Sequence, residues 1–101
     1  MDIAKSFFKK ALGLMFKKDG EMIFVFDRDV NYSVWTPFMR FNIDIFFLDK
    51  DFNVVDRKMG MKPWRIYEPK KKYRYFFESR EGKYDGKSLH NKLKEWRQVL
   101  L

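Results

Sequence analysis

The stretch from Phe41 to Leu48 constrains the fold most, because its residues alternate with the period of a β-strand. One face of this predicted strand is wholly apolar and consists of Phe41, Ile43, Ile45 and Phe47. The opposite face carries Asn42, Asp44, Phe46 and Leu48. Asp44 therefore lies within the strand, where Asp is disfavoured and a buried carboxylate needs a partner. The main question that this sequence raises is which groups form hydrogen bonds or ion pairs with the Asp44 carboxylate.

Further segments predict strands around this one. Residues 22–26 form the continuous apolar run Met-Ile-Phe-Val-Phe, which is typical of a central strand buried on both faces. Residues 32–35 and 73–79 predict two further strands. The polar residues 27–31 predict a loop between the strands over residues 22–26 and 32–35.

The segments after the central strand predict a hairpin and then a long connection. Asn53 is expected to close the hairpin, because Asn tolerates the left-handed backbone conformation that tight loops require. Residues 59–72 contain two Pro and three consecutive Lys, so they are expected to run along the surface in an extended form.

A helix is predicted near each end of the chain. Residues 2–15 form an amphipathic pattern that Asp2 would cap. Ser88 is expected to cap the second helix, whose apolar stripe consists of Leu89, Leu93, Trp96 and Leu100. The expected fold is therefore mainly β, or α+β: a single domain over residues 1–101, built as a small antiparallel β-sandwich or partly open barrel with N-terminal and C-terminal helices.

Positive charge is concentrated in the second part of the chain. Residues 61–101 hold twelve Lys and Arg against five Asp and Glu, whereas residues 1–60 hold ten against nine. A basic surface suggests an anionic partner, such as a nucleic acid, an acidic protein or a membrane surface. The alternative is a solvated, Lys-rich surface that binds nothing.

The composition excludes several kinds of site. With no Cys and a single His, disulfides, thiolate chemistry and a zinc centre are not expected, and the scattered Gly residues form no phosphate-binding loop. We expect no metal and no cofactor. No run approaches the ~20 apolar residues of a membrane span, so we expect a soluble, cytoplasmic protein. Many Lys and Glu, one Gln and no Cys are typical of thermophile proteins.

Several short motifs occur together in an order that resembles the uncharacterised domain-of-unknown-function 192 family. They are Gly13-Leu14-Met15, Gly20-x-Met22-x-Phe24-Val25-Phe26, Trp35, Asn42 to Asp49, Val54-Val55, and Tyr75 to Glu78 with Gly82. The resemblance covers about residues 11–82 and implies a compact, mainly antiparallel β domain without an assigned activity. The chain departs from the family pattern at Asn42, where Pro is usual, and at residues 36–38, where Thr-Pro-Phe replaces Met-Lys-Asn.

Two acidic residues on predicted strands are the candidate functional groups. If their strands are neighbours with matching faces, Asp44 and Glu78 could form a paired-carboxylate site in which one charge raises the pKa of the other group. Trp35 and Tyr75 would add a ring wall, so these four residues are the predicted ligand-binding set. In the structural alternative, Asp44 accepts hydrogen bonds from backbone amides or pairs with an Arg, and Glu78 is an Arg partner.

A basic and aromatic segment over residues 62–75 offers a second site. It combines cations for phosphate with rings for bases, as proteins that bind single-stranded nucleic acid do. The residues that would bind are Lys62, Trp64, Arg65, Lys70, Lys71, Lys72 and Arg74. Alternatively, its rings pack inward and the loop needs no ligand. The sequence therefore favours a non-catalytic binding or interaction module, with a single-strand nucleic-acid binder and a small enzyme as the two alternatives.

Overall fold

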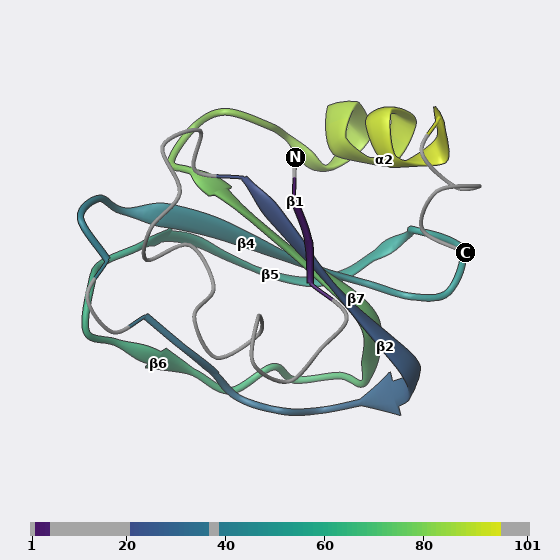
Figure 1. The fold of residues 1–101 in the computed structure, drawn as a ribbon, viewed down its shortest axis with the longest axis horizontal. Helices are drawn as coiled ribbons and strands as arrows, with labels where there is room; N and C mark the ends of the chain where they lie inside the picture. The colour runs from purple at the N-terminus through teal and green to yellow at the C-terminus, as the bar shows by residue number, and fades with distance from the viewer. Residues whose placement is uncertain (1, 5–20, 37–38, 96–101) are drawn as a thin grey trace.

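The structure, a computed structural model, describes residues 2–4, 21–36 and 39–95, which form seven strands and one helix (Figure 1). The strands are β1 (Asp2–Ala4), β2 (Met22–Val30), β3 (Val34–Trp35), β4 (Ile43–Leu48), β5 (Val54–Met61), β6 (Ile66–Tyr67) and β7 (Tyr73–Arg80). The helix is α2 (Gly86–Glu95). The predicted strand over the Phe41–Leu48 stretch is confirmed as β4.

The strands form two sheets. The larger sheet has the order β1-β2-β7-β4-β5, and the smaller pairs β3 with β6. All pairings are antiparallel except that of β1 with β2, which is parallel. Within the described residues the larger sheet is open, with β1 and β5 at its edges. The predicted mainly antiparallel fold is confirmed: the described strands form two sheets and no closed barrel.

The larger sheet has a hydrophobic core on each face, as alternation along β4 predicts. The first core lies toward the small sheet and contains Met22, Phe24, Val30, Val34, Ile43, Ile45, Phe47, Met61, Tyr73 and Phe76. The second core lies under α2 and contains Ile23, Phe46, Leu48, Phe52, Tyr75, Phe77, Leu89 and Leu93. In Figure 1, α2 and β6 accordingly lie on opposite sides of the larger sheet. Residues 22–26 are confirmed as the start of an interior strand with both faces covered.

The structure corrects two predicted boundaries in the first part of the chain. Asp2–Ala4 is a strand rather than the start of a helix, because its backbone pairs with β2, and the rest of that predicted helix lies outside the described residues. The strand β2 also continues through residues 27–30, where a loop was predicted. Its polar residues there are exposed, and Asp29 forms an ion pair with Arg74 at 3.1 Å.

The β4–β5 hairpin is closed by a different residue from the predicted one. Phe52, not Asn53, has the left-handed conformation, with φ of 64°. The Asp49 carboxylate fixes the loop by accepting hydrogen bonds from the backbone amides of Asp51 and Asn53, both at 2.9 Å. The ring of Phe52 is buried against Tyr75, so core packing compensates for an unfavourable backbone conformation.

The helix α2 begins at Gly86, two residues before the predicted cap Ser88. Asp85 accepts a hydrogen bond from the Ser88 amide at 2.7 Å, and the Ser88 hydroxyl lies 3.1 Å from the Asp85 amide, so the two residues cap the helix reciprocally. Leu89 and Leu93 are buried against the sheet, as predicted, and residues 96–101 lie outside the described part. No helix in the described ranges is both long and apolar enough to span a bilayer.

Glu21, just before β2, links α2 and the loop before it to the sheet through ion pairs and a hydrogen bond. Its carboxylate is buried and lies 2.8 Å from Lys83 Nζ and 3.3 Å from Lys92 Nζ, and it accepts a hydrogen bond from Tyr84. Burial opposes ionisation of Glu21, but the hydrogen bonds from Lys83 and Tyr84 and the charges of both Lys outweigh it. Together they lower the pKa of Glu21 to about 2.

Glu21→Gln is expected to lower the free energy of unfolding at pH 7 by about 1–3 kcal/mol, because a buried charge-assisted cluster loses its anion. Since the folded-state pKa lies below the ordinary value of 4.5, the wild-type protein should lose this contribution as the pH falls from 4.5 to about 2. Urea titrations across this range measure both effects. Exposed Glu95→Gln on α2 is the control, and equal losses in the two variants would contradict the assigned role of Glu21.

Candidate functional site

Asp44 is satisfied by the backbone. Its carboxylate is 1% exposed and accepts hydrogen bonds from the amides of Gly60 at 2.7 Å and Gly82 at 2.8 Å. Both Gly have positive φ, 61° and 81°, and the pairing of β4 with β5 is irregular opposite Asp44. The carboxylate therefore joins an irregularity in β5 to the turn after β7. The structure bears out the structural alternative for Asp44, through amides rather than through an Arg.

Glu78 lies on the opposite face of the sheet. On the ladder between β4 and β7, Asp44 is paired with Ser79 and Glu78 with Ile45, and neighbouring residues of a strand point to opposite faces. The carboxyl of Glu78 is therefore directed toward the first core, and the residue is 4% exposed. Burial raises the pKa of Glu78 to about 8, as expected for a desolvated carboxyl rather than one paired with an Arg.

The predicted ligand-binding set is not brought together. Tyr75 is buried in the second core, whereas Trp35 is 59% exposed on the small sheet, which lies beside the first core. Because Asp44 and Glu78 point to different faces, the matching-face condition for a paired-carboxylate site is not met. The small-enzyme alternative therefore has no geometric support, although Asp44 and Glu78 both lie within strands, as predicted.

The basic segment is mostly exposed, but most of its rings are not. Its exposed members are Lys62, Trp64, Arg65, Lys70, Lys71 and Lys72. Arg74 is half-buried and engaged by Asp29. Tyr73 is buried and donates a hydrogen bond to the carbonyl of Tyr32, and Tyr67 donates one to Asp56. Of the rings in this segment, Trp64 is the one left accessible.

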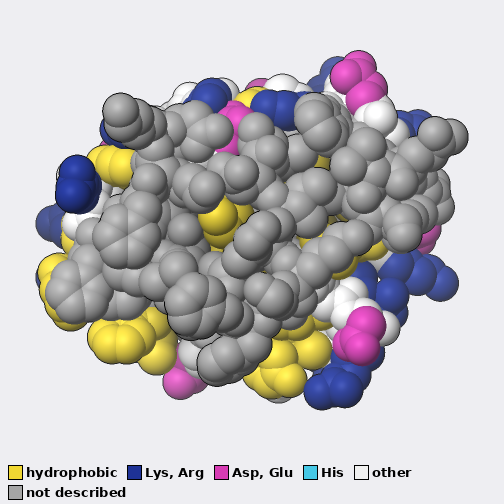
Figure 2. Space-filling model, viewed as in Figure 1, with side chains coloured by type: hydrophobic (Ala, Val, Ile, Leu, Met, Phe, Trp, Pro, Cys, Tyr) yellow, Lys and Arg dark blue, Asp and Glu magenta, His cyan; other side chains and the backbone are white. Residues whose placement is uncertain are grey.

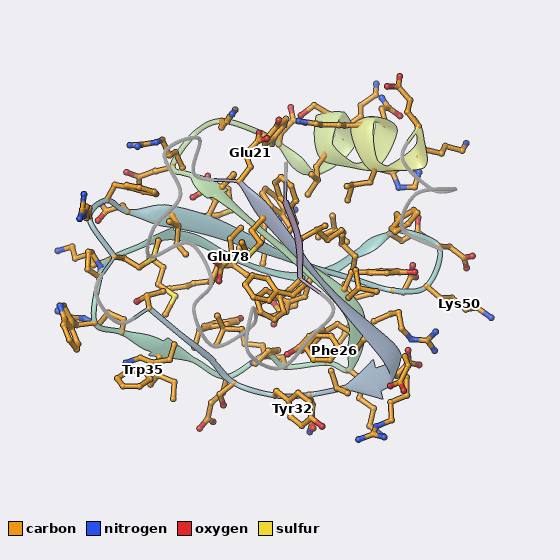
Figure 3. All side chains as sticks on the ribbon, viewed as in Figure 1. Glu21, Phe26, Tyr32, Trp35, Lys50 and Glu78 are labelled. Atoms are coloured by element: carbon orange, nitrogen blue, oxygen red, sulfur yellow. The ribbon has the colours of Figure 1, made fainter. Side chains whose placement is uncertain are left out.

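An exposed apolar surface lies on the small sheet, and we call it the tryptophan surface. It consists of Trp35, Trp64 and Ile66, which are 59%, 52% and 66% exposed. Trp35 pairs with Ile66 across the β3–β6 ladder, and the rings of Trp35 and Trp64 meet edge to face with centroids 6.5 Å apart. The neighbouring ladder pair, Val34 and Tyr67, points the other way and packs on the first core. Trp35 projects outward at one end of the molecule (Figure 3).

A buried Thr holds the backbone beneath Trp64. Thr36 is 2% exposed, and its hydroxyl donates to the Lys62 carbonyl at 3.0 Å while accepting from the Arg65 amide at 3.0 Å. Its carbonyl accepts from the Trp64 amide at 2.7 Å, and its amide donates to the Arg65 carbonyl at 3.0 Å. This network ties the backbone of Lys62, Trp64 and Arg65 to Thr36.

The conformation of Trp64 is unusual for a bulky residue. Its φ is 62°, in the left-handed region that residues with large side chains avoid. Among the described residues other than Gly, only Phe52 shares this feature, and its ring is buried in the core. The ring of Trp64, by contrast, is half exposed. Strain of this kind clusters at functional sites.

Cations flank the tryptophan surface. Lys62 and Arg65 lie on either side of Trp64 in the loop, and both are exposed. Residues 57–74 contain eight Lys and Arg and one acidic residue, Glu68. In Figure 2, hydrophobic side chains lie next to Lys or Arg side chains along the left edge of the face shown. The described ranges contain no group of three or more acidic, His or Cys side chains placed to hold a metal ion.

The sequence did not single out Thr36 or Ile66. Thr36 is one of the positions at which the chain departs from the family pattern, and this departure was the available signal. The strand β6 has two residues, so its sequence contains no alternation from which the outward orientation of Ile66 could be predicted.

Comparison with known proteins identifies relatives of this chain. Residues 1–92 match the model of the DUF192 family, described as "Uncharacterized ACR". A UPF0127 protein of Pyrococcus horikoshii is 47% identical over 83 residues, which are 79% of this chain and 71% of that protein. A UPF0127 protein of Pyrococcus furiosus is 43% identical over 78% of this chain and 70% of its own length. These relatives come from thermophilic archaea, in agreement with the composition.

Two solved structures share the fold. A protein of unknown function from Novosphingobium aromaticivorans superimposes with a TM-score of 0.71 and 21% identity over 79% of this chain and 61% of its own. A protein from Sinorhizobium meliloti, provisionally described as a transcription regulator, gives 0.73 and 18% identity over 91% of this chain and 71% of its own. At these identities the likeness concerns the fold alone.

Proposed function

This chain belongs to the DUF192 family, whose function is unknown, and we propose that it is a non-catalytic binding module for an anionic partner. The contact site is the tryptophan surface with Lys62 and Arg65 beside it. A cytoplasmic location, which the sequence suggests, is part of this proposal.

The backbone of Trp64 carries the proposal. Trp64 keeps a strained backbone although its ring is half exposed, and hydrogen bonds of Thr36 maintain this arrangement. Proteins retain such costs where a side chain must be presented in one orientation to a partner. The flanking cations and the formal net charge of +8 favour a partner of negative charge.

Replacing each of the two left-handed aromatic residues by Gly tests whether the Trp64 ring serves the fold. Trp64→Gly should change the free energy of unfolding by no more than about 1 kcal/mol, because relief of strain offsets the lost contacts and the greater freedom of Gly in the unfolded chain. Phe52→Gly, the matched control, should lose about 3–5 kcal/mol because its ring is fully buried. Guanidinium titrations measure both values, and a loss for Trp64→Gly as large as that for Phe52→Gly would assign the ring to the core.

Binding itself is tested with three anionic probes: a single-stranded oligonucleotide, vesicles containing phosphatidylserine, and polyglutamate. We expect at least one of them to change the tryptophan fluorescence of the wild-type protein, and Trp64→Gly to weaken its binding. If none binds, or if Trp64→Gly binds as the wild type does, the binding-module proposal is wrong.

A further inference from the structure

We propose that the partner of the tryptophan surface is single-stranded nucleic acid, an inference that rests on the proposed function and gives its ligand a chemical class. Bases would stack on Trp35 and Trp64, and the phosphates would be neutralised by Lys62 and Arg65. This combination of rings and cations underlies binding of single strands with little sequence preference.

The ring geometry suits a flat aromatic ligand. The two Trp rings meet at 67°, with centroids 6.5 Å apart, and therefore form a corner rather than a closed stack. Both side chains remain more than half exposed in this arrangement. A base that stacks on one ring would meet the edge of the other, and both contacts are favourable geometries for aromatic pairs.

The loop brings charge to the same place. Lys62 and Arg65 are exposed and are anchored through their backbone groups to Thr36, so their side chains start from fixed points on either side of Trp64. Arg65 also donates a hydrogen bond from its guanidinium to the Trp64 carbonyl, at 3.4 Å. A chain of phosphates running past the rings would meet a cation on each side of Trp64.

The size and rigidity of the surface favour a linear ligand over the other two anionic partners. Three half-exposed side chains present on the order of 400 Å², about half of the ~800 Å² that a globular partner usually covers on each side. A membrane contact needs apolar side chains that reach the lipid, but it does not need a defined backbone conformation beneath one ring. Stacking of a base benefits from rings at defined positions, and the Thr36 network ties down the backbone from which Trp64 projects.

Fluorescence anisotropy of a labelled, mixed-sequence 12-nucleotide single strand tests the inference over a series of salt concentrations. Trp64→Gly and Trp35→Ala should each weaken binding at least about fivefold, because a stacked base contributes that much or more. In Lys62→Ala/Arg65→Ala, the slope of log K against log salt should become shallower by about 1.4, as two phosphate contacts are lost. Lys50→Ala/Lys87→Ala removes the same charge elsewhere and should change the slope much less; Figure 3 places Lys50 at the opposite end of the molecule from Trp35.

The outcomes separate this inference from the proposed function. Binding of the vesicles or of polyglutamate that depends on Trp64, without binding of the oligonucleotide, would overturn the nucleic-acid inference and leave the binding module in place. Oligonucleotide binding that both double variants weaken equally, and that neither Trp variant affects, would show nonspecific attraction to a basic protein and would overturn both. Loss of binding in the Trp variants together with the altered slope in Lys62→Ala/Arg65→Ala supports both.

Discussion

Asp44→Ala is expected to lower the free energy of unfolding by about 3–6 kcal/mol, since each hydrogen bond to a charged group contributes roughly 1.5–3 kcal/mol and two are lost. The amides of Gly60 and Gly82 would lose the acceptor that links them across the sheet. Each of these Gly has a positive φ, a conformation that Gly adopts readily, and in this conformation both amides donate to the carboxylate. Urea titration measures the loss.

Asp44→Asn separates the hydrogen bonds from simple filling of space. Asn keeps one acceptor oxygen but presents an NH₂ group to the second amide, so we expect a loss of about half that of the Ala variant. Asp51→Ala, in the exposed hairpin, is the control and should change stability by less than about 0.5 kcal/mol. Equal losses in Asp44→Ala and Asp44→Asn would mean that the carboxylate does not act as a double acceptor.

The wild-type protein is expected to lose stability as the pH rises from about 4.5 to about 8, because Glu78 ionises more readily in the unfolded chain. Its pKa is 4.5 in the ordinary state and about 8 in the fold, so between these values the folded protein holds a proton that the unfolded chain has released. The favourable contribution of Glu78 is complete below pH 4.5 and is lost as the pH rises through 8. The total change is on the order of 3–5 kcal/mol, at 1.36 kcal/mol for each pH unit of separation.

Glu78→Gln should remove this dependence, because an amide has the shape of the protonated acid and does not titrate. The variant should therefore be more stable than the wild-type protein at pH 8.5 and close to it at pH 4.5. Glu68→Gln, at an exposed position, should keep the wild-type pH profile. A profile for Glu78→Gln that falls between pH 4.5 and 8 as steeply as that of the wild-type protein would show that Glu78 ionises freely in the fold.

Much of the sheet was predictable because local patterns and burial agree there. Alternation along β4 assigned Ile43, Ile45 and Phe47 to one core and Phe46 and Leu48 to the other, and the structure has them so. The same rule failed at one residue of β7. Tyr73 packs in the first core although Tyr75 and Phe77 are in the second, because the pairing of β2 with β7 shifts between Val25 and Val30. A register shift depends on two strands, so neither strand shows it alone.

The candidate site was less predictable than the fold. Trp35 and Trp64 were both named as candidates, but in two different sites, because 28 intervening residues separate them along the chain. The β3–β6 pairing and the hydrogen bonds of Thr36 bring them together. The carboxylates show the reverse case: Asp44 and Glu78 were proposed as one pair, and the register between β4 and β7 separates them.

The sequence by itself determined which residues must be hidden from water and that Asp44 among them would need a partner, because alternation and hydrophobicity are properties of each segment alone. Only the tertiary structure decided that Gly60 and Gly82 would supply that partner and that Trp64 would be held outward by Thr36. These contacts join residues that are 16 to 38 positions apart or depend on a positive φ. The free energy of such contacts depends on how whole strands pair, and no single segment encodes that.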